Sequence, residues 1–134
     1  LEKHRLKDST PMTPAMALIW ALNAQLDRML AEGLENRYAR HAAMAKRTQD
    51  WGISQGMEPL APAGYRSKTV STINNTRNMD IPGLNEFLKP HELRIANGYG
   101  DLKNKTYRIA HMGEIQMSDV DKLLGLMDEY LKTL

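Results

Sequence analysis

The feature that most constrains the fold is a change of hydrophobic period at Gly56. Before this glycine, apolar side chains recur at steps near three, four and seven, which places them on one face of an α-helix. After it, short runs rich in β-branched residues are separated by glycine and proline, a pattern typical of strands and turns. The chain is therefore expected to form long helices first and a small sheet after them.

Two long helices are predicted before the change of period. Thr13 followed by Pro14 is a helix start, because a threonine hydroxyl caps free amides and proline suits the first helical position. The first helix is expected to end near Gly33, and a second is predicted over residues 34–55. Residues 1–12 are polar and are predicted to be extended.

The second part of the chain predicts strand, strand, helix, strand, strand, helix. The predicted elements are strands at 57–60 and 68–74, a helix at 81–89 capped by Asp80, strands at 93–96 and 106–112, and a last helix capped by Ser118. The last helix carries a clean apolar stripe, which predicts that one face is buried. We therefore expect an α/β fold, an α+β sandwich in which long N-terminal helices precede a small, mainly antiparallel sheet packed against helices.

Composition narrows the classes of function. The chain has 134 residues, of which 42% are hydrophobic and 25% charged, enough for one globular domain with a core. A net charge of +2 is too small to indicate nucleic-acid binding, and no apolar run reaches the roughly 18 residues that span a bilayer. Cysteines are absent and the four histidines lack metal-binding spacing, so no metal site is expected. We expect a soluble, cytoplasmic protein without nucleic-acid or membrane partners.

Arg108 is the main candidate for a binding residue. It lies between Tyr107 and Ile109 in a strand predicted to be half-buried, where an unpaired guanidinium is costly. It therefore needs an anionic partner, either a structural carboxylate or a bound ligand. Gly98 and Gly100 permit backbone shapes closed to other residues, and Gly113 lets the backbone approach a ligand closely, so the surroundings favour a ligand.

Three other polar residues are weaker candidates. Ser9 and Thr10 lie in a hydroxyl-rich segment before the first long helix, and a helix N-terminus supplied with hydroxyls is a natural place for an anion such as phosphate. A plain helix cap is the alternative. His111 is interpreted either as a histidine hydrogen-bonded within the sheet or as a functional residue.

Three segments, in order along the chain, carry a resemblance to a known family. They are Thr-Pro-x-Thr-Pro at 10–14, Glu-Gly-Leu-Glu-Asn at 32–36 with Arg40 and His41 following, and Lys-x-x-Arg-Ile-x-His-Met-Gly at 105–113. Together they resemble the C-terminal part of class V aminotransferases, nearest to the serine-pyruvate and alanine-glyoxylate aminotransferases. The resemblance covers nearly the whole chain.

The resemblance implies an enzyme that depends on pyridoxal phosphate. Such an enzyme moves an amino group between a small amino acid of the serine or alanine type and a 2-oxo acid of the pyruvate or glyoxylate type. It implies that Arg108 binds the substrate carboxylate, and that Ser9 and Thr10 contact the phosphate of the neighbouring subunit's cofactor in a homodimer.

The resemblance also implies how the chain is divided. It places the catalytic lysine outside this sequence, so residues 1–13 would be a linker from an absent large domain, and residues 14–134 the C-terminal small domain. That domain would hold no catalytic residue and would be inactive alone. The alternative is a self-contained α/β interaction or regulatory module in which Arg108 forms a structural ion pair.

Overall fold

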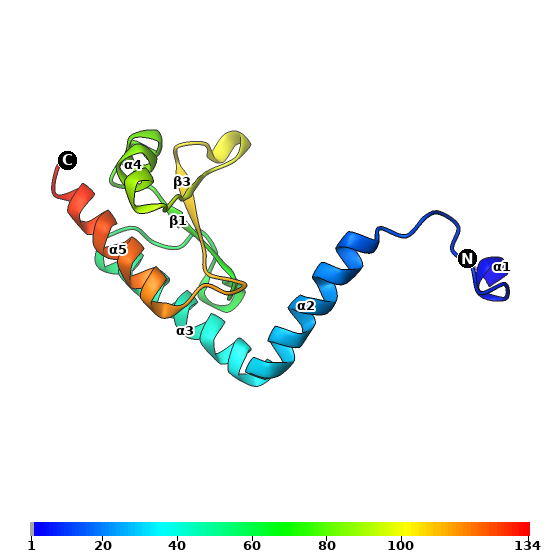
Figure 1. Cartoon of the computed structure of the whole chain (residues 1–134). Coiled ribbons are helices and arrows are strands. Elements are labelled where there is room, and N and C mark those ends of the chain that lie inside the picture. Colours follow the sequence, from blue (N-terminus) through cyan, green and yellow to red (C-terminus); the bar gives the residue numbers. More distant parts are fainter. Residues whose placement is uncertain (1) are drawn as a thin grey trace. The chain divides into compact units, whose positions relative to one another are not determined.

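The computed structural model describes residues 2–134, which form two compact units (Figure 1). The first unit extends to Arg37, and the second comprises Tyr38–Leu134. The first contains α1 (Glu2–Arg5), α2 (Met16–Glu32) and the beginning of α3 (Leu34–Ser54). None of the helices in residues 2–134 is long and apolar enough to cross a membrane.

Helices in the first unit depart from the prediction at their starts. Residues 2–5 form one helical turn instead of an extended lead-in, with Glu2 at its beginning and Arg5 at its end, where these charges complement the helix dipole. The cap of α2 is Ala15, two residues after the predicted Thr13, and it makes no side-chain bond. The predicted end is confirmed, since Gly33 has a φ of 83° and its amide bonds to the Met29 carbonyl.

The second unit contains the sheet. After α3 come β1 (Val70–Asn74), α4 (Ile81–Leu88), β2 (Ala96–Asn97), β3 (Thr106–Ala110) and α5 (Met117–Leu131), with single 3-10 turns at Ala63–Tyr65, Lys89–His91 and Gly100–Leu102. The strand order is β1-β3-β2, and both pairings are antiparallel. The predicted fold, a small antiparallel sheet packed against helices, is confirmed.

All four predicted strands are shorter in the structure, and one cap differs. Residues 57–60 form a single bridge, between Pro59 and Ile73, because Pro59 lacks the amide that a ladder needs. Of the strand expected at 93–96, only Ala96 pairs with β3, and Asn97 beyond it is the other residue of β2. Gln116, rather than Ser118, caps α5. The backbone N–H of Gln116 donates to the Asp119 carboxylate over 2.8 Å, which completes a capping box.

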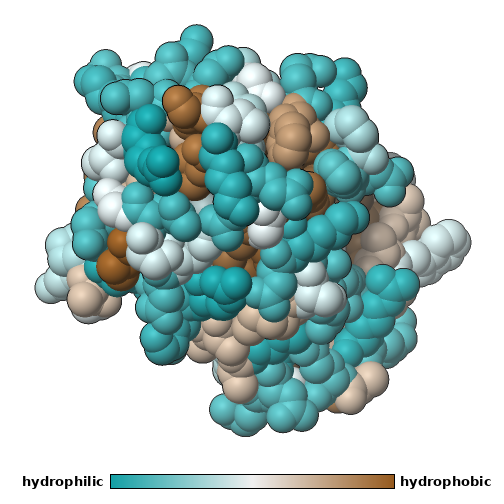
Figure 2. Space-filling model, turned by 90° about the vertical axis from the view of Figure 1, so that its left-hand side faces the viewer, coloured by the Kyte–Doolittle hydropathy of each residue, from teal (hydrophilic) through white to brown (hydrophobic). Residues whose placement is uncertain are grey.

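The core of the second unit lies between one face of the sheet and the helices α3 and α5. Ile73, Tyr107 and Ile109 from the strands are at most 1% exposed, and the apolar stripe of α5 is buried against them. The helices α3 and α5 lie side by side, joined by a 2.7 Å bond from the Trp51 indole to the Asp128 carboxylate. Figure 2, which faces the side where α5 lies in Figure 1, shows a mostly hydrophilic surface with scattered apolar residues.

Candidate functional site

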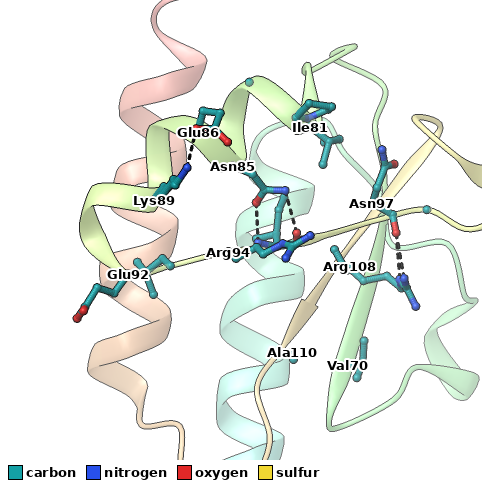
Figure 3. Close-up of a pocket in the computed structure, with 16 residues that line it drawn as sticks. Val70, Ile81, Asn85, Glu86, Lys89, Glu92, Arg94, Asn97, Arg108 and Ala110 are labelled. Atoms are coloured by element: carbon teal, nitrogen blue, oxygen red, sulfur yellow. Dashed lines mark hydrogen bonds and ion pairs between the residues drawn. The ribbon is translucent and has the colours of Figure 1, made fainter.

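A groove of about 1320 Å³ lies in the second unit, against the sheet face that turns away from the core. We call this face the open face. Its walls are α4, residues 92–98 and the outward residues of β1 and β3 (Figure 3). The groove lies wholly within the second unit, so its geometry does not depend on the first.

Strand alternation places Arg108 in this groove. Successive side chains of a strand point to opposite faces, and in β3 Tyr107 and Ile109 are buried whereas Arg108 and Ala110 are exposed. The guanidinium itself is therefore solvated, which corrects the expectation that burial forces an anionic partner on it. Burial of its two neighbours fixes the register and the direction of the arginine.

The Arg108 guanidinium is held by one backbone carbonyl. Its Nε and Nη2 atoms donate to the Asn97 oxygen over 3.2 and 3.1 Å. Among the ion pairs of residues 2–134, none includes Arg108, so the structural ion pair of the alternative reading is not formed within this part of the chain. A guanidinium has five N–H donors, so donors remain for an anion in the groove.

The loop before β3 depends on a glycine for reasons of space. A Cβ on Gly98 would lie 2.0 Å from the Leu102 carbonyl oxygen, and the Gly98 amide donates to the Thr106 carbonyl over 2.9 Å. Its requirement is close packing, whereas the unusual backbone shape predicted for Gly98 and Gly100 occurs at Gly100, with a φ of 56°. Gly98 thus brings the loop against the start of the strand that carries Arg108.

Ser9 and Thr10 lie in the first unit, on an exposed segment. They line a shallow groove of about 410 Å³ with Glu2, His4, Arg5 and Pro11. The Thr10 hydroxyl donates to the Met12 carbonyl over 2.6 Å, so its proton is already used. The Ser9 hydroxyl donates to the His4 carbonyl over 3.4 Å, which is long for a hydrogen bond. A phosphate oxygen can replace this weak bond. Of the two hydroxyls, Ser9 fits a phosphate better.

His111 is a buried residue at the end of β3. Its Nε2 atom is 2.9 Å from the Ser71 hydroxyl, and the side chain is fully buried. Burial is the main cause that lowers the pKa of His111, and the nearby His41 lowers it further, against a smaller opposite effect of backbone carbonyls. The interpretation of His111 as a histidine hydrogen-bonded within the sheet agrees with this geometry.

Sequence reasoning missed three groove residues, Asn85, Arg94 and Asn97. A signal for Arg94 was present: the order Leu93-Arg94-Ile95 repeats the apolar–arginine–apolar pattern around Arg108. No comparable signal marks Asn97, because it contributes a backbone carbonyl, which every residue possesses.

Comparison with known proteins finds aminotransferases among the relatives by sequence. No protein-family model matches the chain. Over 96% of its length the chain is 34% identical to an uncharacterized aminotransferase of Methanocaldococcus jannaschii, and covers 34% of that protein. Over 90% of its length it is 32% identical to the L-aspartate–glyoxylate aminotransferase of Paracoccus denitrificans, and covers 30% of it. The chain thus spans about a third of these curated relatives.

Solved structures share the fold. An alanine–glyoxylate aminotransferase from Nostoc sp. superposes with a TM-score of 0.81 at 24% identity, over 93% of this chain and 34% of that one. A phosphoserine aminotransferase from Cytophaga hutchinsonii gives 0.84 at 24% identity, over 95% of this chain and 35% of that one. By sequence and fold together, the homologues of this chain are class V aminotransferases, of which it matches about a third of the length.

Proposed function

We propose that this chain is the C-terminal small domain of a pyridoxal-phosphate-dependent aminotransferase, and that Arg108 binds the carboxylate of the amino-acid substrate. In this proposal residues 1–13 are the linker from a large domain, and residues 14–134 form the small domain. The observation that carries the proposal is a guanidinium directed into a groove with one backbone carbonyl as partner, in a chain whose homologues are aminotransferases.

The chemistry of arginine supports this role. A planar guanidinium matches a carboxylate through two parallel N–H bonds, which fixes the orientation of the substrate as well as binding it. Hydrogen bonds to charged groups are worth about 1.5–3 kcal/mol each. The bonds to the Asn97 carbonyl hold the arginine in place before the substrate arrives, which lowers the entropic cost of binding.

The cofactor and partners follow from the same proposal. Pyridoxal phosphate, when bound, supplies the chemistry of amino-group transfer. Ser9, and less favourably Thr10, would donate a hydroxyl hydrogen to the cofactor phosphate across a homodimer interface. The substrates would be a small amino acid of the serine or alanine type and a 2-oxo acid of the pyruvate or glyoxylate type. The enzyme would work in the cytoplasm.

Steady-state kinetics of the longer protein test the proposal. Arg108→Ala is expected to raise the KM for the amino acid and to lower kcat/KM by roughly 100-fold or more, because two charge-assisted bonds are lost. Arg108→Lys keeps the charge but not the two-bond geometry, so it should recover only part of the loss. Arg77→Ala, at an exposed arginine outside the groove, is the matched control. Unchanged kinetics in Arg108→Ala would favour the self-contained module instead.

A further inference from the structure

Arg94 is a second arginine in the same groove. It is exposed and lines the groove with Arg108, and its side chain forms no hydrogen bond or ion pair within residues 2–134. Figure 3 labels both arginines among the residues that line the groove, with the Arg108 guanidinium bonded to Asn97. The proposed function uses only one of these cations, so the second has no assigned role.

Register puts the two arginines on the same side of the sheet. Ala96 pairs directly with Arg108, and the alternation of exposed Arg94, buried Ile95 and exposed Ala96 places Arg94 two residues away on the face of Ala96. Both arginines line the same groove, and their side chains are long enough to converge on one ligand there. One extended dianion can therefore contact both guanidinium groups.

Asn85 holds the backbone that carries Arg94. Its side-chain amide donates to the Ile95 carbonyl over 3.1 Å, and its side-chain oxygen accepts from the Ile95 amide over 2.9 Å (Figure 3). These two bonds fix both polar groups of the residue after Arg94 to α4. Asn85 thus anchors the backbone next to Arg94 to α4.

The other charges of the groove leave its centre cationic. Glu86 and Lys89 lie 3.4 Å apart and compensate one another. Glu92 lines the groove, but Figure 3 shows its carboxylate directed out of it, away from Arg94 and Arg108. An anion between the two arginines therefore meets two positive charges and no facing carboxylate of the groove lining.

We propose that Arg94 and Arg108 together bind an amino acid with a second acidic group, so that one substrate of the enzyme is a dicarboxylic amino acid or its oxo acid. This inference rests on the proposed function, in which Arg108 takes the α-carboxylate. Arg94 takes the side-chain carboxylate, while a small neutral substrate uses Arg108 alone. Asn85 acts as a positioning residue for Arg94.

Substrate discrimination in the longer protein tests the inference. Arg94→Gln is expected to lower kcat/KM for aspartate or glutamate roughly 10- to 100-fold and to leave the value for alanine within about 2-fold, because one charge-assisted contact is lost only with the diacid. Arg94→Lys should restore part of this discrimination. Arg77→Gln is the control for loss of a positive charge elsewhere. Equal losses for both substrates, or no loss for the diacid, would overturn the inference.

A binding measurement separates this inference from the proposed function. Titration calorimetry with succinate and propionate reports on carboxylate binding without turnover. Arg94→Gln should weaken succinate roughly 10-fold and leave propionate unchanged, whereas Arg108→Gln should weaken both. If Arg108→Gln alters neither ligand, the proposed function fails. If Arg108→Gln lowers the affinity for both ligands, while Arg94→Gln changes the affinities for succinate and propionate by the same factor, only the dicarboxylate assignment fails.

Discussion

The two faces of the sheet are made by the same strands and differ in almost every property. On the core face, Ser71, Ile73, Tyr107 and Ile109 are at most 3% exposed. On the open face, Arg108 and Ala110 are exposed and Val70 is half-buried, and all three line the groove. One face therefore stabilises the domain, and the other is available for binding.

This difference shows how a small domain can change what it binds while keeping its fold. Arg108 and Ala110 are each flanked along the chain by buried neighbours that fix the register, because a shift of one residue would exchange the two faces. Substitutions should therefore divide cleanly, with core-face changes altering stability and open-face changes altering ligand preference. The following predictions concern the free energy of unfolding of residues 1–134, from the largest expected effect to the smallest.

Ile109→Ala should give the largest effect. Ile109 is 1% exposed in the core between the sheet and α5, so truncation leaves a cavity as well as losing apolar contact. We expect the free energy of unfolding to fall by about 2–5 kcal/mol in urea denaturation. A loss below about 0.5 kcal/mol would contradict the assignment of this face to the core.

Gly98→Ala should lower the free energy of unfolding by less than Ile109→Ala does, because it crowds the backbone instead of leaving a cavity. The added Cβ would lie 2.0 Å from the Leu102 carbonyl oxygen, which is backbone and must shift. We expect a loss of about 1–3 kcal/mol in urea denaturation. Gly64→Ala is the matched control, because its Cβ meets nothing within 4 Å and its stability should change by less than about 0.5 kcal/mol.

His111→Gln should change the pH dependence of stability. Burial lowers the pKa of His111 below its usual value of about 6.5, so the unfolded chain binds a proton that the folded chain does not. The contribution of neutral His111 to the free energy of unfolding is fully present above the pKa that this histidine has in the unfolded chain. It is lost as the pH falls towards the lower pKa of His111 in the folded chain. Denaturation curves between pH 7 and pH 5 should thus be flatter in the variant. His91→Gln, which removes an exposed histidine, should keep the original slope.

Thr72→Ala should have the smallest effect. Thr72 pairs with Arg108 across the open face and is only half-buried, so its loss removes little apolar contact. We expect a change within about 0.5 kcal/mol in the same urea assay. A larger loss would mean that the open face also contributes to stability, which would weaken the contrast between the two faces.

Much of this architecture was predictable from local patterns. The end of α2 at Gly33, the cap of α4 by Asp80 and the buried stripe of α5 follow from residue type and spacing, and each is confirmed. The start of α5 was misplaced because glutamine is a less usual cap than serine, and the reciprocal bonds of Gln116 and Asp119 decide the position.

The groove was only partly predictable. Arg108 could be singled out from its apolar neighbours, but its exposure could not, because the sequence does not say which sheet face the helices cover. Asn85 could not be found at all, since its role depends on the distance between α4 and the segment before β2. In the sequence, a polar residue on a short helix cannot be told from an ordinary surface residue. Only the structure shows that the side-chain nitrogen and oxygen of Asn85 are both hydrogen-bonded.

The bonds between Asn85 and Ile95 also bear on the solubility of the domain. Because β2 is an edge strand of only two residues, an adjoining segment with unpaired backbone groups would offer a template for strands from other molecules. The Asn85 side chain of α4 is hydrogen-bonded to both the amide and the carbonyl of Ile95. A strand from another molecule can therefore pair there only after displacing Asn85. The contact that holds the second arginine in place thereby also protects the sheet against aggregation at this edge.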